Sequence, residues 1–314
     1  MNTRQDTFTS LNVRDHNLSE VLRLIHSHGA MSRAALSRET GLSATTISAL
    51  VTVLLESGFV REVGEAESSG GRPPILMEFE YEHHYAIGID LGAAHITAIV
   101  IDFRGSPIAS VTQEFDAMAD ASGAITAIRA LIRQVVKKAG IDLTQVFGIG
   151  VGVPAPLEGE QLDRLSPVIL PAWKDIDLRA EMRAEFGDLP IYIDNDANSG
   201  ALAEKWWGRG REHSNLAYIK LGTGVGSGLI INNDIYRGSA GTAGEIGHTT
   251  ISPNGPLCRC GNHGCMESYV GTPAILANAA SKLKGKSSSA LQNQNLTVRD
   301  VALGAVQGDP VCVQ

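Results

Sequence analysis

Cysteine is scarce in this sequence, and its placement excludes one class of protein. Only four cysteines occur in 314 residues, and three of them crowd together at Cys258, Cys260 and Cys265. They lie too close together in the chain for a useful disulfide framework, so a disulfide-stapled secreted domain is excluded. The crowding suits a metal site in a reducing compartment, and Cys312 stands apart.

Long apolar runs are also missing. No run approaches the ~18 residues that a membrane-spanning helix needs. The first twelve residues include Arg4 and Asp6 and have no long apolar core, so no signal peptide is visible. We therefore expect a cytoplasmic protein with no membrane partner.

Basic residues are not in excess. Lys and Arg number 26 against 34 Asp and Glu, which gives a net charge of -8 and a pI of about 5.6. This balance excludes a protein whose whole surface coats nucleic acid or anionic membrane, although a local DNA-binding module remains possible. The 43% of hydrophobic residues are enough for at least two packed domains.

The N-terminal segment has the pattern of a helix-turn-helix. Apolar residues at helical spacing predict a first helix over residues 17–25. Ser32 can cap a second helix over residues 33–40, Gly41 permits a tight turn, and Ser43 can cap a third helix. In this motif the third helix enters the major groove of DNA, with the start of the helix at the base edges. The small side chains expected to face that groove are Ser43, Ala44, Thr45, Thr46 and Ser48.

A hairpin after the third helix predicts a wing. Strands are expected at residues 59–63 and 75–79, joined by a polar loop. Arg72 ends that loop, between glycines and prolines that suit a segment lying along a phosphate backbone or in a minor groove. The module has almost no net charge, so a three-helix protein-interaction domain is the alternative. We expect residues 1–82 to form a winged helix-turn-helix domain that binds double-stranded DNA.

The remainder of the chain alternates strands and helices, which indicates an α/β domain. A helix is expected at residues 121–139, from apolar residues at helical spacing. The expected strands lie at residues 85–90, 96–102, 107–115, 147–153 and 191–193. Polar residues follow several of these strands, and the ends of the strands are where such sheets place ligands.

Glycine is concentrated between Gly222 and Gly228, with four glycines in seven positions. The backbone N–H groups of such a loop can approach a phosphate or a sugar hydroxyl closely. A glycine-rich hairpin that serves only the geometry of a sheet is the alternative.

The three crowded cysteines have a histidine partner nearby in the chain. His248, Cys258, Cys260 and Cys265 would supply three thiolates and one imidazole, which is a closed tetrahedral set of the structural zinc type. We therefore expect Zn²⁺. The alternative is a group of reduced, buried thiols beside an incidental histidine.

These motifs together resemble the ROK family, which joins bacterial transcriptional repressors and sugar kinases. The resemblance covers nearly the whole chain, and the Cys/His block is its most specific part. The matching motifs are Ser-Gly-Gly-Arg-Pro at 69–73, Asp-Leu-Gly at 90–92, Asn-Asp-Ala-Asn at 195–198, the glycine loop, Glu-Ile-Gly-His at 245–248 and the cysteine cluster. The resemblance implies an actin-like, two-lobed, sugar-kinase-like body, with lobes at 83–196 and 197–314, and a sugar cleft.

The resemblance also implies which residues hold a sugar, since the ROK residues at the matching positions contact sugar hydroxyls. The residues carried over are Asn195, Asp196, Glu245, His248 and Glu267. His248 would then serve both zinc and sugar, with one ring nitrogen for each. For Asp196 the alternative is a helix N-cap.

Two departures from the family pattern are visible. ROK kinases have Asp-x-Gly-Gly-Thr in the first phosphate loop, and this chain has Asp-Leu-Gly-Ala-Ala-His at 90–95. The loss of a glycine and a hydroxyl weakens triphosphate binding, on which phosphoryl transfer depends, although Asp196 matches the position of the kinase base. The chain also stops earlier than ROK members usually do, so we expect it to be C-terminally incomplete.

The sequence therefore predicts a sugar-responsive transcriptional repressor rather than an enzyme. Its partners would be operator DNA, a sugar or sugar-derivative effector, and further copies of itself in a homodimer or homotetramer. It would control genes for carbohydrate uptake or catabolism. The alternative is an ATP-dependent sugar kinase with an attached DNA-binding module.

Overall fold

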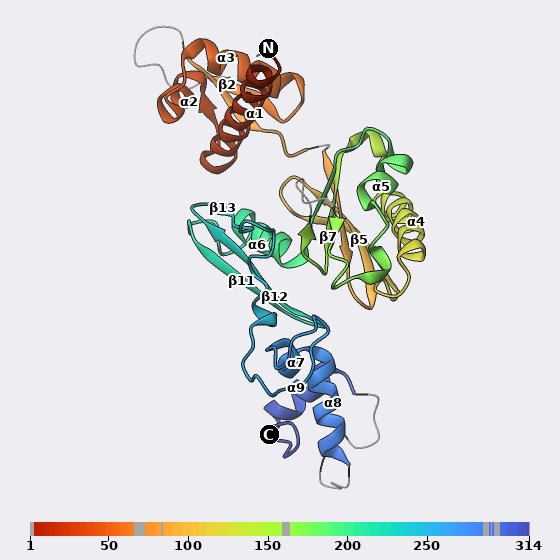
Figure 1. Ribbon diagram of the computed structural model, residues 1–314. Coiled ribbons are helices and arrows are strands. Elements are labelled where there is room, and N and C mark those ends of the chain that lie inside the picture. The colour runs from red at the N-terminus through yellow and green to blue at the C-terminus, as the bar shows by residue number, and fades with distance from the viewer. Residues whose placement is uncertain are drawn as a thin grey trace. The chain divides into compact units, whose positions relative to one another are not determined.

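The computed structural model describes residues 3–65, 73–82, 84–158, 164–284, 289, 291 and 296–313, and of residues 3–12 and 65 it describes the backbone only. The chain divides into two compact units (Figure 1). The N-terminal unit comprises Met1–His84 with Asp102–Arg104, and the C-terminal unit comprises Tyr85–Ile101 with Gly105–Gln314. Among the described helices, none is both long enough and apolar enough to cross a membrane.

The N-terminal unit is a winged helix-turn-helix, as predicted. Its elements are α1 (Thr3–His28), β1 (Met31–Ser32), α2 (Arg33–Thr40), α3 (Ala44–Glu56), β2 (Val60–Glu65) and β3 (Ile75–Phe79). The three strands pair antiparallel in the order β1-β3-β2. Strand β1 was not predicted, because a strand of two residues shows no alternation of apolar and polar side chains. The first helix was predicted over residues 17–25 and is longer in the structure.

Capping fixes the turn between α2 and α3. The Ser32 hydroxyl accepts from the N–H of Ala35 at 3.2 Å, and the Ser43 hydroxyl accepts from the N–H of Thr46 at 3.1 Å. Gly41 takes the left-handed conformation with φ 70°, which costs glycine little. The buried apolar residues of this unit include Val21, Ile25, Leu36, Ile47, Leu50, Val51 and Leu54. Ile47, Leu50, Val51 and Leu54 form the buried face of α3, and the opposite face of this helix is exposed to solvent.

The first part of the C-terminal unit is built on a five-stranded sheet in the order β10-β7-β4-β5-β6. Its elements are β4 (Tyr85–Leu91), β5 (His95–Asp102), β6 (Pro107–Glu114), α4 (Ala121–Ala139), the short 3-10 helix η1 (Leu143–Gln145), β7 (Val146–Val153), α5 (Leu178–Phe186) and β10 (Ile191–Asn195). Strands β4, β7 and β10 run parallel, whereas β5 and β6 are antiparallel. A short pair, β8 (Leu157–Glu158) and β9 (Arg164–Leu165), and the 3-10 helix η2 (Pro171–Trp173) lie between β7 and α5.

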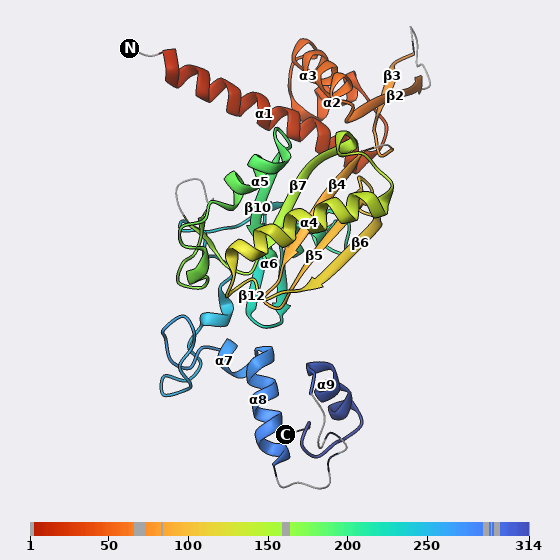
Figure 2. The same ribbon diagram turned by 90° about the vertical axis from the view of Figure 1, so that its right-hand side faces the viewer.

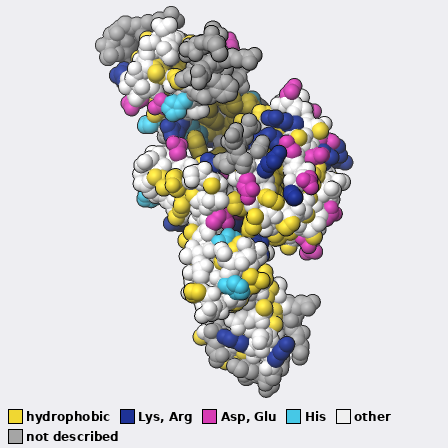
Figure 3. Space-filling model, viewed as in Figure 1, with side chains coloured by type: hydrophobic (Ala, Val, Ile, Leu, Met, Phe, Trp, Pro, Cys, Tyr) yellow, Lys and Arg dark blue, Asp and Glu magenta, His cyan; other side chains and the backbone are white. Residues whose placement is uncertain are grey.

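Helices α4 and α5 lie side by side over one face of this sheet (Figures 1 and 2). The bounds predicted for α4 are confirmed, because its apolar residues recur at helical spacing and form one buried stripe. On the outer face, Arg129 pairs with Glu181 at 2.7 Å, and Arg133 pairs with Glu185. Basic and acidic side chains are accordingly interspersed over this region in Figure 3.

The second part of the C-terminal unit is built on a smaller antiparallel sheet in the order β11-β12-β13. Its elements are α6 (Asp196–Trp206), β11 (Leu216–Leu221), β12 (Val225–Ile231), β13 (Asp234–Ile235), the 3-10 helix η3 (Ile246–His248), α7 (Glu267–Val270), α8 (Thr272–Leu283) and α9 (Val298–Val306). Helix α6 packs against β11 and β12. Residues 222–224 of the predicted glycine loop form the turn between β11 and β12, and its remaining residues, 225–228, belong to β12.

The register of the parallel strands brings their carboxyl ends to one edge of the larger sheet. Asp90 of β4 and Asp194 of β10 both align with Gly152 of β7. Asn195 ends β10 and α6 begins at the next residue. Residues that are far apart in the sequence therefore meet where an α/β sheet places ligands.

Candidate functional site

A cavity of about 170 Å³ opens at this edge of the sheet. The turn between β4 and β5, the start of α6 and the glycine loop all contribute to its lining. All five residues predicted to hold a sugar line it, namely Asn195, Asp196, Glu245, His248 and Glu267. The structure thus brings together side chains that are spread over more than seventy positions of the sequence.

Asn195 acts as the N-cap of α6. Its Oδ1 accepts from the N–H groups of Ala197 at 2.9 Å and Asn198 at 3.3 Å, and its Nδ2 donates to the carbonyl oxygen of Ala155 at 3.3 Å. The alternative that Asp196 is the cap is therefore wrong. Asn195 has the extended backbone that a cap requires, and Asp196 is the first helical residue. The cap holds Asp196 at the rim of the cavity.

Asp196 has a cationic partner that sequence reasoning missed. Lys220 Nζ lies 2.5 Å from Asp196 Oδ2, and the Asp196 side chain is only 13% exposed. Lys220 lies on β11 and also lines the cavity. The available signal was a single lysine in an apolar strand, two residues before the glycine loop.

Glu267 is held by a second cation, which was also missed. Arg259 Nε lies 2.9 Å from Glu267 Oε1, and its Nη2 donates to Oε2 at 3.3 Å. The same Oε2 accepts from the N–H of Val225 at 2.9 Å. Because three donors fix this buried carboxylate, its position in the cavity is defined before any ligand binds.

Glycine is required where the loop meets this pair. A Cβ on Gly224 would lie 2.8 Å from Arg259 Nη2 and 3.0 Å from Glu267 Oε2. A Cβ on Gly244, whose φ is +93°, would collide with the carbonyl oxygen of Ser227. The glycines therefore allow the segment before Glu245 to lie against β12.

Glu245 is the carboxyl group of the cavity that is least neutralised. Burial raises its pKa, and the negative charges of Glu267 and Asp196 raise it further, while Arg259 partly opposes them. The carboxylate oxygens of Glu245 can accept hydrogen bonds from the hydroxyl groups of a ligand.

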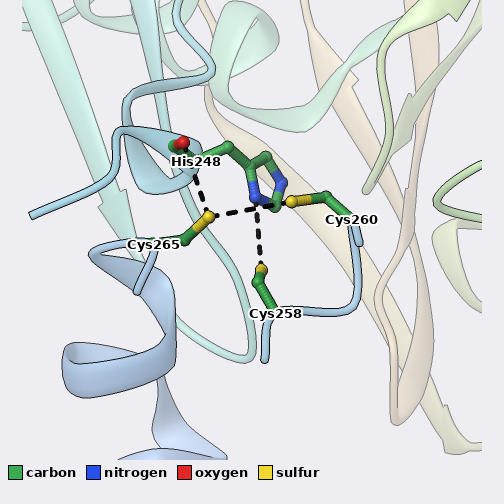
Figure 4. Close-up of side chains that lie close together, drawn as sticks. All are labelled: His248, Cys258, Cys260 and Cys265. Atoms are coloured by element: carbon green, nitrogen blue, oxygen red, sulfur yellow. Dashed lines mark hydrogen bonds between the residues drawn. The ribbon is translucent and has the colours of Figure 1, made fainter. Parts of the chain in front are cut away.

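The three crowded cysteines converge on His248 (Figure 4). Cys258 Sγ lies 3.5 Å from His248 Nδ1, and Cys260 Sγ lies 3.7 Å from Cys265 Sγ. The four candidate ligand atoms all lie within 4.8 Å of one another. His248 belongs to η3, whereas the cysteines come from the loop that leads into α7.

These distances fit a tetrahedral zinc ion. With Zn–S of about 2.3 Å and Zn–N of about 2.0–2.1 Å, ideal tetrahedral angles separate two sulfurs by about 3.8 Å and a sulfur from a nitrogen by about 3.6 Å. One sulfur–sulfur pair at 3.7 Å and one sulfur–nitrogen pair at 3.5 Å have these separations, and all four atoms lie within 4.8 Å of one another. The four residues could therefore hold one metal ion between them.

The pKa values of two of the clustered thiols, Cys265 and Cys258, are shifted in opposite directions. Burial, with hydrogen bonds from Cys260 and Cys258, raises the pKa of Cys265 to about 12. Burial also pushes the pKa of Cys258 upward, but hydrogen bonds from the Cys260 N–H and from Ser268 outweigh it and leave that pKa lowered. A bound divalent metal deprotonates a coordinating thiol outright, so it would remove this imbalance.

The predicted DNA-contacting residues divide into two groups. Ser43 and Thr46 share a side-chain hydrogen bond of 2.8 Å within the cap of α3. Ala44, Thr45 and Ser48 are exposed. Arg72 lies outside the described residues. Ala49 and Thr52, which the sequence reasoning left out, extend the exposed face at helical spacing from Thr45.

The ring of His95 packs against the turn between β4 and β5. His95 Nε2 lies 3.2 Å from Asp90 Oδ2. A Cβ on Gly92 would lie 2.7 Å from the ring carbon Cε1 of His95, so the ring sits against the backbone of the loop. His95 therefore lies against the turn between β4 and β5, which lines the cavity.

Comparison of the sequence with known families assigns both units. The ROK family profile matches residues 86–314. The chain belongs to the ROK family. A winged helix-turn-helix DNA-binding profile matches residues 14–61 of this ROK protein, so the predicted fold class and resemblance are confirmed.

Among curated relatives of this ROK protein, the "Xylose repressor" of Bacillus subtilis is 36% identical over 274 residues, which cover 87% of this chain and 70% of the relative. The "DNA-binding transcriptional dual regulator NagC" of Escherichia coli is 26% identical over 299 residues, which cover 95% of this chain and 72% of the relative. The match to a xylose repressor of Caldicellulosiruptor bescii spans 64% of that protein's length.

Two solved structures are similar in fold to this ROK protein. A ROK family transcriptional regulator, a homologue of the E. coli Mlc protein, has a TM-score of 0.79 at 25% identity, over 96% of this chain and 76% of that one. A ROK family glucokinase from Streptomyces griseus, solved with glucose and AMPPNP, has a TM-score of 0.64 at 30% identity, over 73% of each chain.

Proposed function

We propose that this ROK protein is a sugar-responsive transcriptional repressor, which binds operator DNA through its N-terminal unit and a sugar in the cavity of its C-terminal unit. The observation that carries the proposal is the presence, in one chain, of a winged helix-turn-helix and a ROK body. Relatives whose matches cover 87% and 95% of this chain are named as sugar repressors. Sugar binding alters the affinity for the operator, and the genes controlled are those of carbohydrate uptake or catabolism.

The DNA interface is the exposed start of α3. Ala44, Thr45 and Ser48 face the major groove, while Ser43 and Thr46 hold the cap and can meet the DNA backbone. Arg72 contacts phosphates or the minor groove from the wing. The protein acts in the cytoplasm as a homodimer or homotetramer, and dimer symmetry implies half-sites about one helical turn apart.

The sugar site is the cavity lined by Asn195, Asp196, Glu245, His248 and Glu267. Sugars present adjacent hydroxyls that both donate and accept, so they require fixed carboxylates and amides. The cavity supplies three carboxyl groups in defined positions. Asn195 contributes through the cap geometry, with one amide hydrogen left for a ligand.

The metal is a structural Zn²⁺ held by His248, Cys258, Cys260 and Cys265. When bound, it cross-links the loop before α7 to η3 and supplies no catalytic position, because its shell is closed. Cys265 lies two residues before Glu267, and His248 lies three residues after Glu245. The cross-link therefore orients two sugar-binding carboxyl groups.

Sugar kinase activity is the second candidate, favoured by the likeness to a ROK glucokinase and by Asp196 at the position of the base. Two observations weigh against it. The loop has Ala93 and Ala94 in place of Gly and Thr, and His95 covers Gly92. Lys220 also occupies Asp196 Oδ2, the group that would accept the proton of the sugar hydroxyl.

Two assays test this assignment. In a mobility shift with the promoter DNA of the protein's own operon, the apo protein should retard the fragment and a responding sugar should release it. Absence of specific retardation would contradict the repressor. Incubation with ATP and a hexose panel should give no product, and turnover near the ~1–100 s⁻¹ typical of kinases would establish the enzyme instead.

A further inference from the structure

We propose that the turn between β5 and β6, with Phe103 at its tip, couples the cavity of the C-terminal unit to the DNA-binding N-terminal unit. The inference rests on the proposed function and adds to it the route by which a bound sugar changes the affinity for the operator. It follows from the unit to which this turn belongs and from the elements that reach it.

The β5–β6 turn is part of the N-terminal unit, although the strands on both sides of it are not. Asp102–Arg104 belong to the N-terminal unit, whereas β5 up to Ile101 and the chain from Gly105 onward belong to the C-terminal unit. With the step from His84 to Tyr85, the chain passes from one unit to the other at three places. A displacement of these strands therefore acts on the N-terminal unit through three covalent connections rather than through one linker.

Phe103 packs against the core of the N-terminal unit. Its ring is stacked on the ring of Phe59, with centroids 5.9 Å apart and an angle of 5° between the planes. Its centroid also lies 5.8 Å from that of Phe79, which is buried. The next residue, Arg104, places its guanidinium group 4.5 Å from the centre of the Tyr81 ring, within the range of a cation–π contact. The tip of the turn is thus held by an aromatic cluster.

The aromatic cluster is joined to α3, which carries the proposed DNA-contacting face. The N–H of Phe59 donates to the carbonyl oxygen of Leu54 at 3.1 Å, in the last turn of α3. Leu54 is buried in the same core against which Phe103 packs. Packed cores shift between discrete arrangements and do not deform continuously. A displacement of Phe103 therefore requires the rings beside the end of α3 to repack.

The opposite end of β5 lies at the cavity. Strands β4 and β5 are neighbours in the larger sheet (Figure 2), and His95, the first residue of β5, lines the cavity. Strand β5 has eight residues, so its two ends are about 25 Å apart. Phe103 is therefore too far from the cavity to touch a ligand there, and any effect of Phe103 on the response to a sugar has to be transmitted.

Helix α6 makes a second connection from the cavity to the same turn. Asp196, its first residue, lines the cavity, and Trp207 follows its last residue. A Cβ on Gly105 would lie 2.6 Å from Trp207 Cδ1, so the indole ring packs on the backbone of the turn. A ligand that displaces the start of β5 or of α6 thus acts on the turn through regular elements, which carry coupling between distant sites.

The competing explanation is that the turn only anchors the N-terminal unit. An anchor would affect the stability of that unit, but not the ratio of the operator affinities measured without and with sugar. This ratio is the coupling factor. Linkage requires the operator to change the affinity for the sugar by the same factor, so the coupling factor can be measured from both sides.

Three variants test the aromatic contact. Phe103→Ala removes the ring, and Phe103→Leu keeps an apolar side chain at the tip of the turn. Leu22→Ala is the matched control, because Leu22 packs against the same core but belongs to α1. It should loosen the N-terminal unit without altering the turn.

Two further variants test the contact with α6. Gly105→Ala adds a methyl group against Trp207 at a backbone φ of +79°. Gly140→Ala is its control, because Gly140 ends α4 with a similar φ of +69° and a Cβ there would meet no atom within 4 Å. Both variants strain a left-handed backbone, but only the first disturbs the turn.

The experiment is a titration of the full chain with promoter DNA of its own operon, followed by fluorescence anisotropy, without sugar and with D-xylose, D-glucose or N-acetylglucosamine. Calorimetry with the same sugars measures their binding. We expect a coupling factor of about 5–150 in wild type and of less than about 2 in Phe103→Ala, which should still bind both sugar and DNA. Phe103→Leu should be intermediate, Leu22→Ala should keep the wild-type factor, and Gly105→Ala should have a lower factor than Gly140→Ala.

A wild-type coupling factor in Phe103→Ala would overturn the inference and leave the proposed function standing. Equal loss of coupling in Leu22→Ala would also overturn it, since any loosening of the core would then suffice. If Phe103→Ala no longer binds the operator, the two glycine variants replace it, and equal factors in Gly105→Ala and Gly140→Ala would overturn the inference. If folded wild type binds none of the three sugars, or if no sugar changes its affinity for the operator, the proposed function itself is refuted, and the inference with it.

Discussion

Nε2 of His248 lies 3.7 Å from Oε2 of Glu245, while Nδ1 of the same ring lies 3.5 Å from Cys258 Sγ. One imidazole therefore faces the cysteine cluster with one nitrogen and the sugar cavity with the other. A ring held on one side by a metal has a fixed orientation and a fixed tautomer on the other side. This relationship links the state of the proposed metal site to the geometry of the proposed sugar site.

Loss of the metal should therefore weaken sugar binding, although no cysteine lines the cavity. Cys260→Ser removes one thiolate, and we expect purified wild type to hold about one zinc per chain and the variant much less. Metal analysis beside a melting-temperature assay with the responding sugar checks both effects. Cys312→Ser is the matched control and should keep its zinc and its sugar response. A metal-free wild type that responds fully to the sugar would refute the link.

Glu245→Ala should reduce, without abolishing, the stabilisation that the sugar gives. The substitution removes the carboxyl group that Glu245 presents beside His248, and one hydrogen-bonding partner of a ligand typically contributes about 0.5–1.5 kcal/mol. A ligand at ~100 times its dissociation constant should stabilise wild type by about 2.7 kcal/mol. The measurement is the ligand-induced shift in melting temperature. Glu212→Ala, an exposed substitution of the same kind, should leave the shift intact, and a full shift in Glu245→Ala would show that Glu245 does not contact the sugar.

Thr45→Asp should abolish specific operator binding without unfolding the protein. Thr45 is the second residue of α3, where an acidic side chain is favourable for the helix but repels the phosphates of DNA. Ser122→Asp adds the same charge at the second residue of α4, which is also capped and also exposed there. In a mobility shift the first variant should lose retardation and the second should keep it. Equal loss in both would indicate a general charge effect rather than contact by α3.

Gly224→Ala should disturb the sugar site and lower stability. Its Cβ would press on Arg259 and Glu267 at 2.8 and 3.0 Å, so the ion pair that orients Glu267 has to move. Gly226→Ala is the matched control for stability, because the nearest atom to its Cβ is the Ala197 methyl at 3.8 Å. We expect the first variant to melt at a lower temperature than the second and to bind the responding sugar more weakly than wild type does. Identical melting temperatures would show that the pair adapts freely.

The sequence by itself determined much of the local structure, because local structure follows from local pattern. Helix α4 shows a complete apolar stripe, so its bounds at 121–139 could be predicted from spacing alone. Ser32 and Ser43 act as caps, as predicted, because capping depends only on a hydroxyl and the next turn of backbone. The Cys/His set was predicted from residue types whose chemistry leaves few other uses.

Tertiary structure alone decided which charges meet. Lys220 and Arg259 could not be placed in the cavity from the sequence, because their partners are 24 and 8 residues away and lie on other elements. The same holds for the choice between Asn195 and Asp196 as the cap of α6, since two adjacent residues can both cap and only the backbone at the end of β10 selects one. Periodicity specifies which face of an element is buried. Which side chains then share a cavity depends on strand order and register, which long-range packing fixes.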